Sequence, residues 1–142
     1  DENVEAYGLL DHRHTAEMDM NLGATVLFTP HLVPMNRGIL ATCYARPAVD
    51  GLSTDAVLKV LAQRYADEPF GVASTRSPST KATLGTNAAH VTARYDARTG
   101  TVVSIAAIDN LGKGASGQAV QCMNLALGLP ETQGLAVVGT AP

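Results

Sequence analysis

Two histidines, an arginine and a glutamate lie within six residues near the start of the chain, at His12, Arg13, His14 and Glu17. Histidine exchanges protons near neutral pH, a carboxylate can orient its ring, and arginine binds phosphate or carboxylate through two donors. In an extended segment, residues two apart share a face, so His12 and His14 would point the same way. The stretch indicates acid–base chemistry on an anionic substrate or, alternatively, a solvated turn before a helix. Two histidines and one glutamate are fewer ligands than the four of a typical structural zinc site, so they only weakly indicate a metal site.

A second stretch that could do chemistry is DNLGKGASGQ, at residues 109–118. It follows an apolar run that predicts a buried strand, so it would form a glycine-rich turn between a strand and a helix. Backbone amides at the start of a helix attract anions, and Lys113 adds a positive charge. The spacing matches neither the GxxxxGK[ST] nor the GxGxxG phosphate-binding pattern. The stretch therefore predicts an anion-binding turn or, alternatively, a glycine turn required for tight packing.

Two weaker signals lie between these stretches. Residues 29–38 contain two prolines and end at Arg37 and Gly38, which indicates a rigid segment that presents a cation, or a plain connection between strands. The tripeptide Gly85-Thr86-Asn87 ends a long loop rich in Ser, Thr and Pro. By itself the tripeptide predicts a turn, although long loops within compact domains are often functional.

Hydrophobic periodicity and turn signals predict the elements that must position these residues. The expected strands are Val4–Leu10, Ala24–Thr29, Ile39–Ala45, Phe70–Ala73, Ala89–Tyr95 and Thr101–Ile108. The expected helices are Thr15–Asn21 with Thr15 as N-cap, a helix from Ser53 that Pro69 ends, and Ser116–Leu127. Residues 74–87 predict a loop with at most a brief strand. Thr101–Ile108 is apolar nearly throughout, which predicts a central strand covered on both faces. The mixed order predicts an α+β domain with a mixed, largely antiparallel sheet and helices packed on one face.

Composition narrows the class of protein. A chain of 142 residues with 46% hydrophobic residues is the size of one globular domain, residues 1–142. A net charge of −3 gives no electrostatic case for binding nucleic acid or an anionic membrane, and no apolar run approaches a bilayer span. Cys43 and Cys122 lie within apolar runs, so we expect two buried thiols without a disulfide, typical of a reducing compartment. Cys43 has no neighbouring base or cation to make it a nucleophile.

Several stretches together resemble one family. HRHTAEM is similar to the HRHTPEI signature of N-acetyl-gamma-glutamyl-phosphate reductases, and FTPHLVPMNRGIL, YADEPF, GTNAAH, AAIDNLGKGASGQAVQ and MNLALGLPETQGL follow in that family's order. The resemblance covers nearly the whole chain and is least distinctive near residues 47–64. It implies the C-terminal, substrate-binding and dimerisation domain of a cytoplasmic NADP-dependent enzyme of arginine biosynthesis, with a fold like that of the glyceraldehyde-3-phosphate dehydrogenase C-terminal domain. The family reduces N-acetyl-glutamyl 5-phosphate to the semialdehyde through a cysteine thioester.

The resemblance also implies roles for particular residues. The expected catalytic residues are His14 as proton donor, with His12 and Glu17 orienting it or the substrate. The expected substrate-binding residues are Arg13, Arg37 and Asn87. The expected cofactor contacts, on the nicotinamide side of NADP, are Asn110, Gly112, Lys113 and Gly114. The resemblance implies no metal, and it implies a dimer or tetramer. The helix at residues 116–127 would pack on an NADP-binding domain that this chain does not include.

The chain departs from the family pattern at Ala16, where proline is frequent, and at Gly112, where valine is frequent. The first change is mild, because a proline in the first turn mainly presets the helix. The second predicts a more flexible anion-binding turn.

The family's cysteine motif does not occur in the chain, and the chain does not start with Met. We therefore expect an isolated domain or cleavage product that is inactive alone. We expect the histidine turn and the glycine-rich helix entrance to line one cleft, which a second domain would close. A non-catalytic dimerisation or binding module, a small metal-binding domain, and a reductase of a lysine-pathway acyl phosphate are the alternatives.

Overall fold

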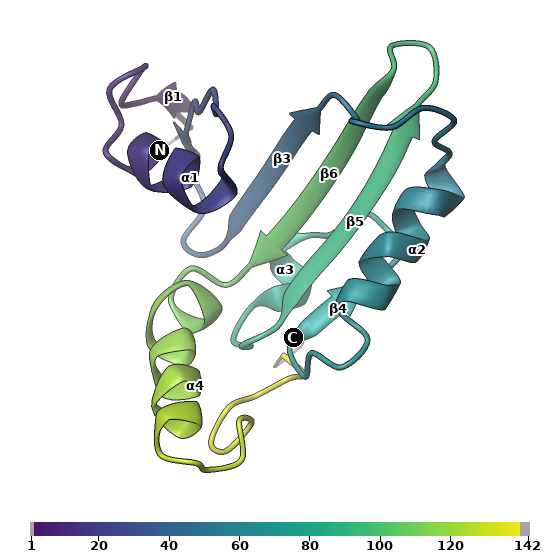
Figure 1. The fold of residues 1–142 in the computed structure, drawn as a ribbon. Coiled ribbons are helices and arrows are strands. Elements are labelled where there is room, and N and C mark those ends of the chain that lie inside the picture. The colour runs from purple at the N-terminus through teal and green to yellow at the C-terminus, as the bar shows by residue number, and fades with distance from the viewer. Residues whose placement is uncertain (1, 140–142) are drawn as a thin grey trace. The chain divides into compact units, whose positions relative to one another are not determined.

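A computed structural model of the chain describes residues 2–139 and comprises two compact units, residues 1–36 and 37–142 (Figure 1). In the first unit, the strands β1 (Glu5–Ala6) and β2 (His31–Leu32) form a short antiparallel pair. The helix α1 (His14–Leu22) lies between them in sequence, and none of its residues is buried.

Two strand predictions in the first unit are wrong. The segment Val4–Leu10 is a strand only at Glu5–Ala6, because Gly8 and Leu10 both adopt positive φ angles, +56° and 65°. The segment Ala24–Thr29 forms no strand. The backbone amide of Val26 donates instead to Oδ1 of Asp19 at 2.7 Å, and strand pairing occurs only after Pro30.

The start of α1 also differs from the prediction. The helix begins at His14 rather than after Thr15, and its N-cap residue Arg13 has helical backbone angles and no side-chain cap hydrogen bond. Glu17 lies in the first turn, as predicted, where a carboxylate suits the positive end of the helix dipole. Gly23 ends the helix in the left-handed conformation, and its amide donates to the carbonyl oxygen of Asp19 at 2.9 Å.

The second unit is built on a four-stranded sheet in the order β3-β6-β5-β4. Its strands are β3 (Ile39–Ala45), β4 (Gly71–Ala73), β5 (Ala89–Asp96) and β6 (Thr101–Ile108). The β5–β6 hairpin and the β3–β6 pair are antiparallel, and only β4 runs parallel to its neighbour. The predicted α+β class with a mixed, largely antiparallel sheet is therefore confirmed.

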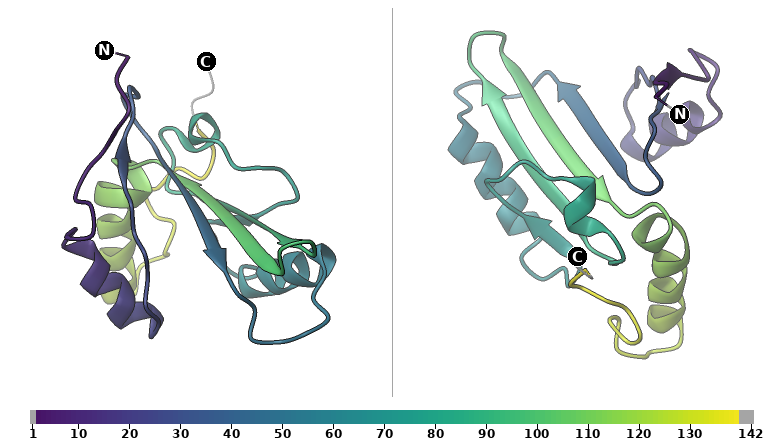
Figure 2. Two further views of the ribbon diagram at one scale, coloured as in Figure 1. Left: turned by 90° about the horizontal axis from the view of Figure 1, so that it is seen from above. Right: turned by 180° about the vertical axis from the view of Figure 1, so that it is seen from behind.

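The strand register defines two faces of this sheet. Leu40, Thr42 and Tyr44 of β3 lie opposite Ala107, Ile105 and Val103 of β6, so these six side chains share one face. Gly71 belongs to the other face. A Cβ at Gly71 would lie 2.7 Å from the ring of Tyr65, which is the C-cap residue of the helix α2 (Thr54–Arg64). The helix α2 thus covers the face opposite to Leu40 and Tyr44, and Figures 1 and 2 show it over β5 and β4.

The strand β6 is central, as predicted, but it is not covered on both faces. Seven of its eight residues are half-buried and only Ala107 is buried. All seven residues of the edge strand β3 are exposed. These two strands therefore carry more apolar surface than the other elements of the chain cover.

The loop before β5 is more ordered than predicted. Residues 74–87 contain the one-turn helix α3 (Thr80–Thr83), capped by Ser79, whose hydroxyl accepts from the amide of Ala82. Figures 1 and 2 show α3 on the face of the sheet opposite to α2. The loop then buries Thr83, Thr86 and Asn87, so it forms part of the core and is not a solvated connection.

The chain leaves β6 through a π-helical turn, η1 (Gly112–Ser116), and enters the helix α4 (Gly117–Ala126). The prediction of a helix from Ser116 to Leu127 is confirmed to within one residue at each end. Only Gly117 and Asn124 of α4 are buried. No helix within residues 2–139 is long and apolar enough to span a bilayer.

Both cysteines are exposed and unpaired, so the prediction of buried thiols is wrong. Cys43 is exposed because it lies on the edge strand β3, which neither α2 nor α3 covers. Cys122 is exposed because it lies on the outer side of α4. Apolar sequence around a thiol predicts burial only where another element packs against that surface.

The N-cap of α2 gives a direct test of the local structure. The hydroxyl of Ser53 accepts a hydrogen bond from the amide of Ala56 at 3.1 Å. Replacing Ser53 by Ala should lower the free energy of unfolding by about 1 kcal/mol, whereas Ser53→Asp should retain most of it. Urea denaturation monitored by circular dichroism would measure both effects. Equal stability of Ser53→Ala and the parent chain would contradict the assigned cap.

Candidate active site

The histidine turn of the first unit brings His12 and His14 together, with ring centroids 4.8 Å apart and an edge-to-face angle of 62°. The prediction that they share a face is thus confirmed, but for a different reason. The segment is not extended, because Arg13 has helical backbone angles and His14 starts α1. Glu17 follows His14 by three residues in the helix, which places it on a neighbouring position of the same helix surface.

The two histidines have different environments. His12 is half-buried, and its Nδ1 accepts a hydrogen bond from the backbone amide of His14 at 3.2 Å. Its ring also makes edge contacts with Tyr7 and Phe28, at centroid distances of 5.3 and 5.2 Å. His14 is exposed at the first position of α1. His12 is therefore the oriented histidine, and His14 is the more accessible one.

Arg13 and Glu17 are exposed as well. Within residues 2–139, neither side chain forms an ion pair. Two imidazoles, a guanidinium and a carboxylate are thus presented on one short turn, and the cation and the carboxylate are not neutralised by partners in that part of the chain.

The second unit has a hub that sequence reasoning did not single out, the carboxylate of Asp109. Its side chain has no exposed area, and its Oδ1 accepts from Nε of Arg37 at 2.8 Å and from the amides of Leu111 at 2.9 Å and Gly112 at 3.0 Å. Its Oδ2 accepts from the amide of Gly85 at 2.6 Å. One carboxylate therefore joins the start of β3, the loop before β5 and the turn after β6.

These contacts also control the charge of Asp109. Burial by itself would raise the pKa of the carboxyl group, because the charged form loses its hydration. The hydrogen bonds from Arg37, Gly112, Gly85 and Leu111 outweigh that effect, so the pKa of Asp109 lies well below its usual range. The carboxylate therefore remains charged at neutral pH.

In the glycine-rich turn, the amides of Leu111 and Gly112 are not available to an external phosphate, because they are bound to Asp109. Gly112 is also packed so closely that an added Cβ would overlap the carbonyl oxygen of Thr86. This close packing supports the alternative of a glycine required for packing at Gly112. Gly114 is exposed, and a Cβ there would have only ordinary contacts.

Two further predicted residues, Asn87 and Lys113, lie in a polar network around Gln121. Asn87 is buried, and its Nδ2 donates to Oε1 of Gln121 at 2.9 Å. The ammonium group of Lys113 donates to the same oxygen at 2.6 Å, and Nε2 of Gln121 donates to the carboxylate of Glu131 at 2.6 Å. Oδ1 of Asn87 has no partner within residues 2–139 and lies against Gly117, where a Cβ would overlap it. The structure thus brings Asn87 and Lys113 to one amide.

Arg37 and Asn110 fix the entrance to β3. Arg37 is the ion-pair partner of Asp109, and its side chain is 37% exposed. Oδ1 of Asn110 accepts from the amide of Gly38 at 2.7 Å. Gly38 has a φ of +119°, and a Cβ there would lie 2.6 Å from Cβ of Thr80. The predicted cation and the predicted cofactor contact therefore also have structural partners within the second unit.

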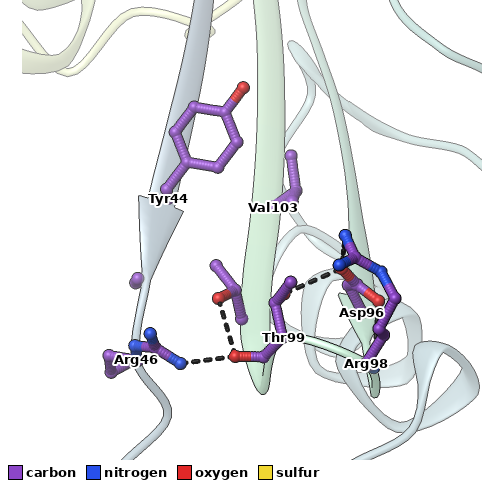
Figure 3. A pocket seen from close by; sticks show the side chains of 8 residues that line it. Tyr44, Arg46, Asp96, Arg98, Thr99 and Val103 are labelled. Carbon is purple, nitrogen blue, oxygen red and sulfur yellow. Dashed lines mark hydrogen bonds and ion pairs between the residues drawn. The ribbon is translucent and has the colours of Figure 1, made fainter.

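An open cavity of about 500 Å³ lies at the far end of the β5–β6 hairpin. Figure 3 shows that Tyr44 and Val103 stand above it on β3 and β6, and that Arg46 reaches toward the turn, where it donates to the carbonyl oxygen of Thr99. Arg98 and Asp96 form its other side, with 3.5 Å between Nη2 and Oδ2. None of the predicted site residues lines this cavity. Within residues 2–139, no three side chains of His, Cys, Asp or Glu are grouped to hold a metal ion.

Comparison with known proteins defines the class of this chain. A family model described as semialdehyde dehydrogenase, dimerisation domain, matches residues 1–110, and the chain belongs to this family.

The names of similar curated proteins describe a narrower class than the family model does. The chain is 51% identical to an N-acetyl-gamma-glutamyl-phosphate reductase of Saccharopolyspora erythraea, over 92% of this chain and 40% of the relative. It is 50% identical to one of Desulforudis audaxviator and 49% identical to one of Frankia casuarinae, over 99% of this chain and 43% of each relative. The chain thus spans about two fifths of the length of the curated relatives that it matches.

The role of Asp109 can be tested through the pH dependence of stability. Because its pKa is lower in the folded chain than in the unfolded chain, its ionised form stabilises the fold above about pH 4. This contribution should be lost as the pH falls below that value. Asp109→Asn should lower the free energy of unfolding at pH 7 by about 2 to 3 kcal/mol and should weaken this acid dependence.

Urea denaturation between pH 3 and pH 7 would measure both quantities. Asp96→Asn is the matched control for stability at pH 7, because Asp96 is a partly exposed carboxylate at the end of β5. The hub assignment is refuted if Asp109→Asn is no less stable at pH 7 than the Asp96 variant.

Proposed function

We propose that this chain is the substrate-binding and dimerisation part of a cytoplasmic N-acetyl-gamma-glutamyl-phosphate reductase of arginine biosynthesis. The observation that carries the proposal is the grouping of His12, His14 and Glu17 in a chain about half identical, over nearly its whole length, to relatives of that name. The proposed reaction reduces N-acetyl-glutamyl 5-phosphate to N-acetyl-glutamate 5-semialdehyde and releases phosphate.

The chain's own residues would bind the substrate and stabilise or protonate the reacting oxygen. The exposed His14 transfers the proton, and Glu17, three residues along α1, orients it or the substrate. Arg13 binds the phosphate or the carboxylate of the substrate. Arg37 contributes its outer guanidinium nitrogens, while its Nε stays on Asp109.

Asn87 acts indirectly. Its side chain is buried and bonded to Gln121, so we assign it to support of the loop rather than to direct contact with the substrate. The thiol that forms the thioester would come from sequence outside these 142 residues. Cys43 lies on an edge strand, and no cation or base is bonded to it within residues 2–139.

The residues present fit only one end of NADP, whose role would be to supply the hydride. The amides of Leu111 and Gly112 are not available to the phosphates of the cofactor, because Asp109 already binds them. Gly114 offers exposed backbone without a side chain, and Lys113 offers a half-buried ammonium group. We therefore assign Asn110, Lys113 and Gly114 to the nicotinamide side, with Gly112 maintaining the packing of the turn.

Two exposed apolar surfaces support a larger assembly. The first is the face of β3 and β6 that includes Leu40 and Tyr44, 53% and 73% exposed, and it would pair with a second copy of the chain. The second lies along α4 and its C-cap, where Met123 and Leu127, four residues apart, are exposed, and it would pack on the NADP-binding domain. Exposed apolar surface of this kind marks interaction sites in soluble proteins.

A chimeric enzyme tests the proposed reaction. Residues 2–142 would replace the corresponding part of the Saccharopolyspora erythraea reductase, and the product would be assayed for phosphate-dependent reduction of NADP⁺ with the semialdehyde. The chimera should be active, and His14→Gln should reduce kcat by about 100-fold or more, because proton transfer then lacks its group.

Arg98→Gln, in the hairpin turn, is the control variant and should leave activity unchanged. A folded chimera without activity would refute the arginine-pathway assignment. Activity with a lysine-pathway acyl phosphate but not with N-acetyl-glutamyl 5-phosphate would favour the alternative of a lysine-pathway reductase.

The pairing surface predicts a dimer of the chain itself. Sedimentation velocity at micromolar concentration should show dimers, and the double variant Leu40→Asp, Tyr44→Asp should sediment as a monomer, because two carboxylates would have to be buried without partners. Val60→Asp is the matched control, since Val60 is an exposed apolar residue on α2. A parent chain that is monomeric under these conditions would rule out pairing through this face.

A further inference from the structure

We propose that Tyr7 and Phe28 are positioning residues. Together with the backbone amide of His14, they hold the ring of His12 in one orientation and one tautomer, with its proton on Nε2. In this state the Nε2–H group of His12 is a fixed hydrogen-bond donor for an oxygen of the substrate. The catalytic part of this inference rests on the proposed function, whereas the structural part does not.

The tautomer follows from the helix start. The amide of His14 donates to Nδ1 of His12 at 3.2 Å, so Nδ1 is an acceptor and cannot carry the proton of the neutral ring. Arg13, the N-cap residue, makes no side-chain cap hydrogen bond. His12 therefore satisfies one of the amides that the first turn of α1 leaves without a helical partner.

The orientation follows from the neighbours of the ring, which include the imidazole of His14 at a centroid distance of 4.8 Å. Tyr7 approaches it at 5.3 Å with an interplanar angle of 68°, and Phe28 at 5.2 Å with an angle of 86°. Edge-to-face contacts of this kind favour a defined ring orientation. On a third side lies Gly8, where an added Cβ would be only 2.8 Å from Cδ2 of His12. The absence of a side chain at Gly8 thus makes room for the ring.

These contacts give the two histidines different roles. A neutral imidazole whose Nε2 carries the proton can donate a hydrogen bond to a developing oxyanion, but it cannot accept a proton at that nitrogen. His12 therefore stabilises charge, and the exposed His14 remains free to exchange protons. The groups that hold the ring come from three parts of the first unit: Tyr7 follows β1, the amide of His14 starts α1, and Phe28 precedes β2.

Nuclear magnetic resonance can test the structural part on the chain itself. Long-range ¹H–¹⁵N correlation spectra of chain labelled with ¹⁵N-histidine distinguish the two tautomers. At a pH where the rings are neutral, His12 should show the Nε2–H tautomer alone. A mixture of tautomers, or the Nδ1–H form, would overturn the proposal.

Variants separate the contributions. Tyr7→Ala and Phe28→Ala should release the ring and give a mixture of tautomers, whereas Tyr7→Phe keeps the ring contact and should preserve the parent spectrum. Arg13→Gln is the matched control, because the side chain of Arg13 makes no cap hydrogen bond and the tautomer of His12 should persist. Retention of the single tautomer in both alanine variants would remove Tyr7 and Phe28 from the proposed role, and so would loss of it in Tyr7→Phe.

The chimeric enzyme supplies the catalytic readout. Tyr7→Ala should lower kcat by about tenfold with little change in KM, since a misplaced donor reduces stabilisation of the transition state more than it reduces the affinity for the substrate. Tyr7→Phe should restore kcat. An inactive chimera whose His12 shows the predicted tautomer would refute the reductase and leave the positioning intact. An active chimera with unchanged kcat in Tyr7→Ala would refute the positioning role in catalysis.

Discussion

The second unit depends on one buried ion, the carboxylate of Asp109. A charge without exposed area is tolerated only when hydrogen bonds replace its lost hydration, and here Arg37 and three backbone amides do so. Because these donors come from segments far apart in sequence, satisfying one carboxylate also fixes where β3 begins, where the loop before β5 turns and how the chain leaves β6. The turn that resembles an anion cradle is thus formed around an internal anion.

Glycines make this arrangement sterically possible. Gly112 allows the turn to lie against the carbonyl oxygen of Thr86, and Gly117 allows α4 to start against the side chain of Asn87. Asn87, Gln121, Lys113 and Glu131 then form a polar chain beside that contact. The core of this unit is therefore small and unusually polar, and its order comes from hydrogen bonds between loops as much as from apolar burial.

The first unit orders the ring of His12 in another way. It has no fully buried residue in the part described, yet His12 is fixed because its ring caps a helix and touches two aromatic rings. Large apolar side chains remain exposed in both units, such as Leu27 in the first unit and Leu127 in the second. This incomplete burial agrees with a chain that spans about two fifths of the curated reductases it matches.

The sequence alone determined the elements whose periodicity is strong and local. The strands Ile39–Ala45 and Thr101–Ile108, the hairpin between β5 and β6, and the helix that Ser53 caps were all predictable, because their hydrophobic pattern and their end signals agree. The grouping of His12, His14 and Glu17 was also predictable, because residues so close in sequence stay close in almost any backbone conformation. The motifs resemble those of N-acetyl-gamma-glutamyl-phosphate reductases, and the chain is about half identical to relatives of that name.

Tertiary structure decided the features that depend on partners distant in sequence. Val4–Leu10 and Ala24–Thr29 have strand composition, but positive φ angles and the side chain of Asp19 remove most of their ladders. Cys43 and Cys122 lie in apolar sequence yet are exposed, because burial requires a covering element that composition cannot reveal. Asp109 resembles an ordinary turn residue until Arg37, 72 positions away, is placed beside it. Local sequence fixes backbone preference, but the free energy of a buried charge is set by neighbours that only the fold assembles.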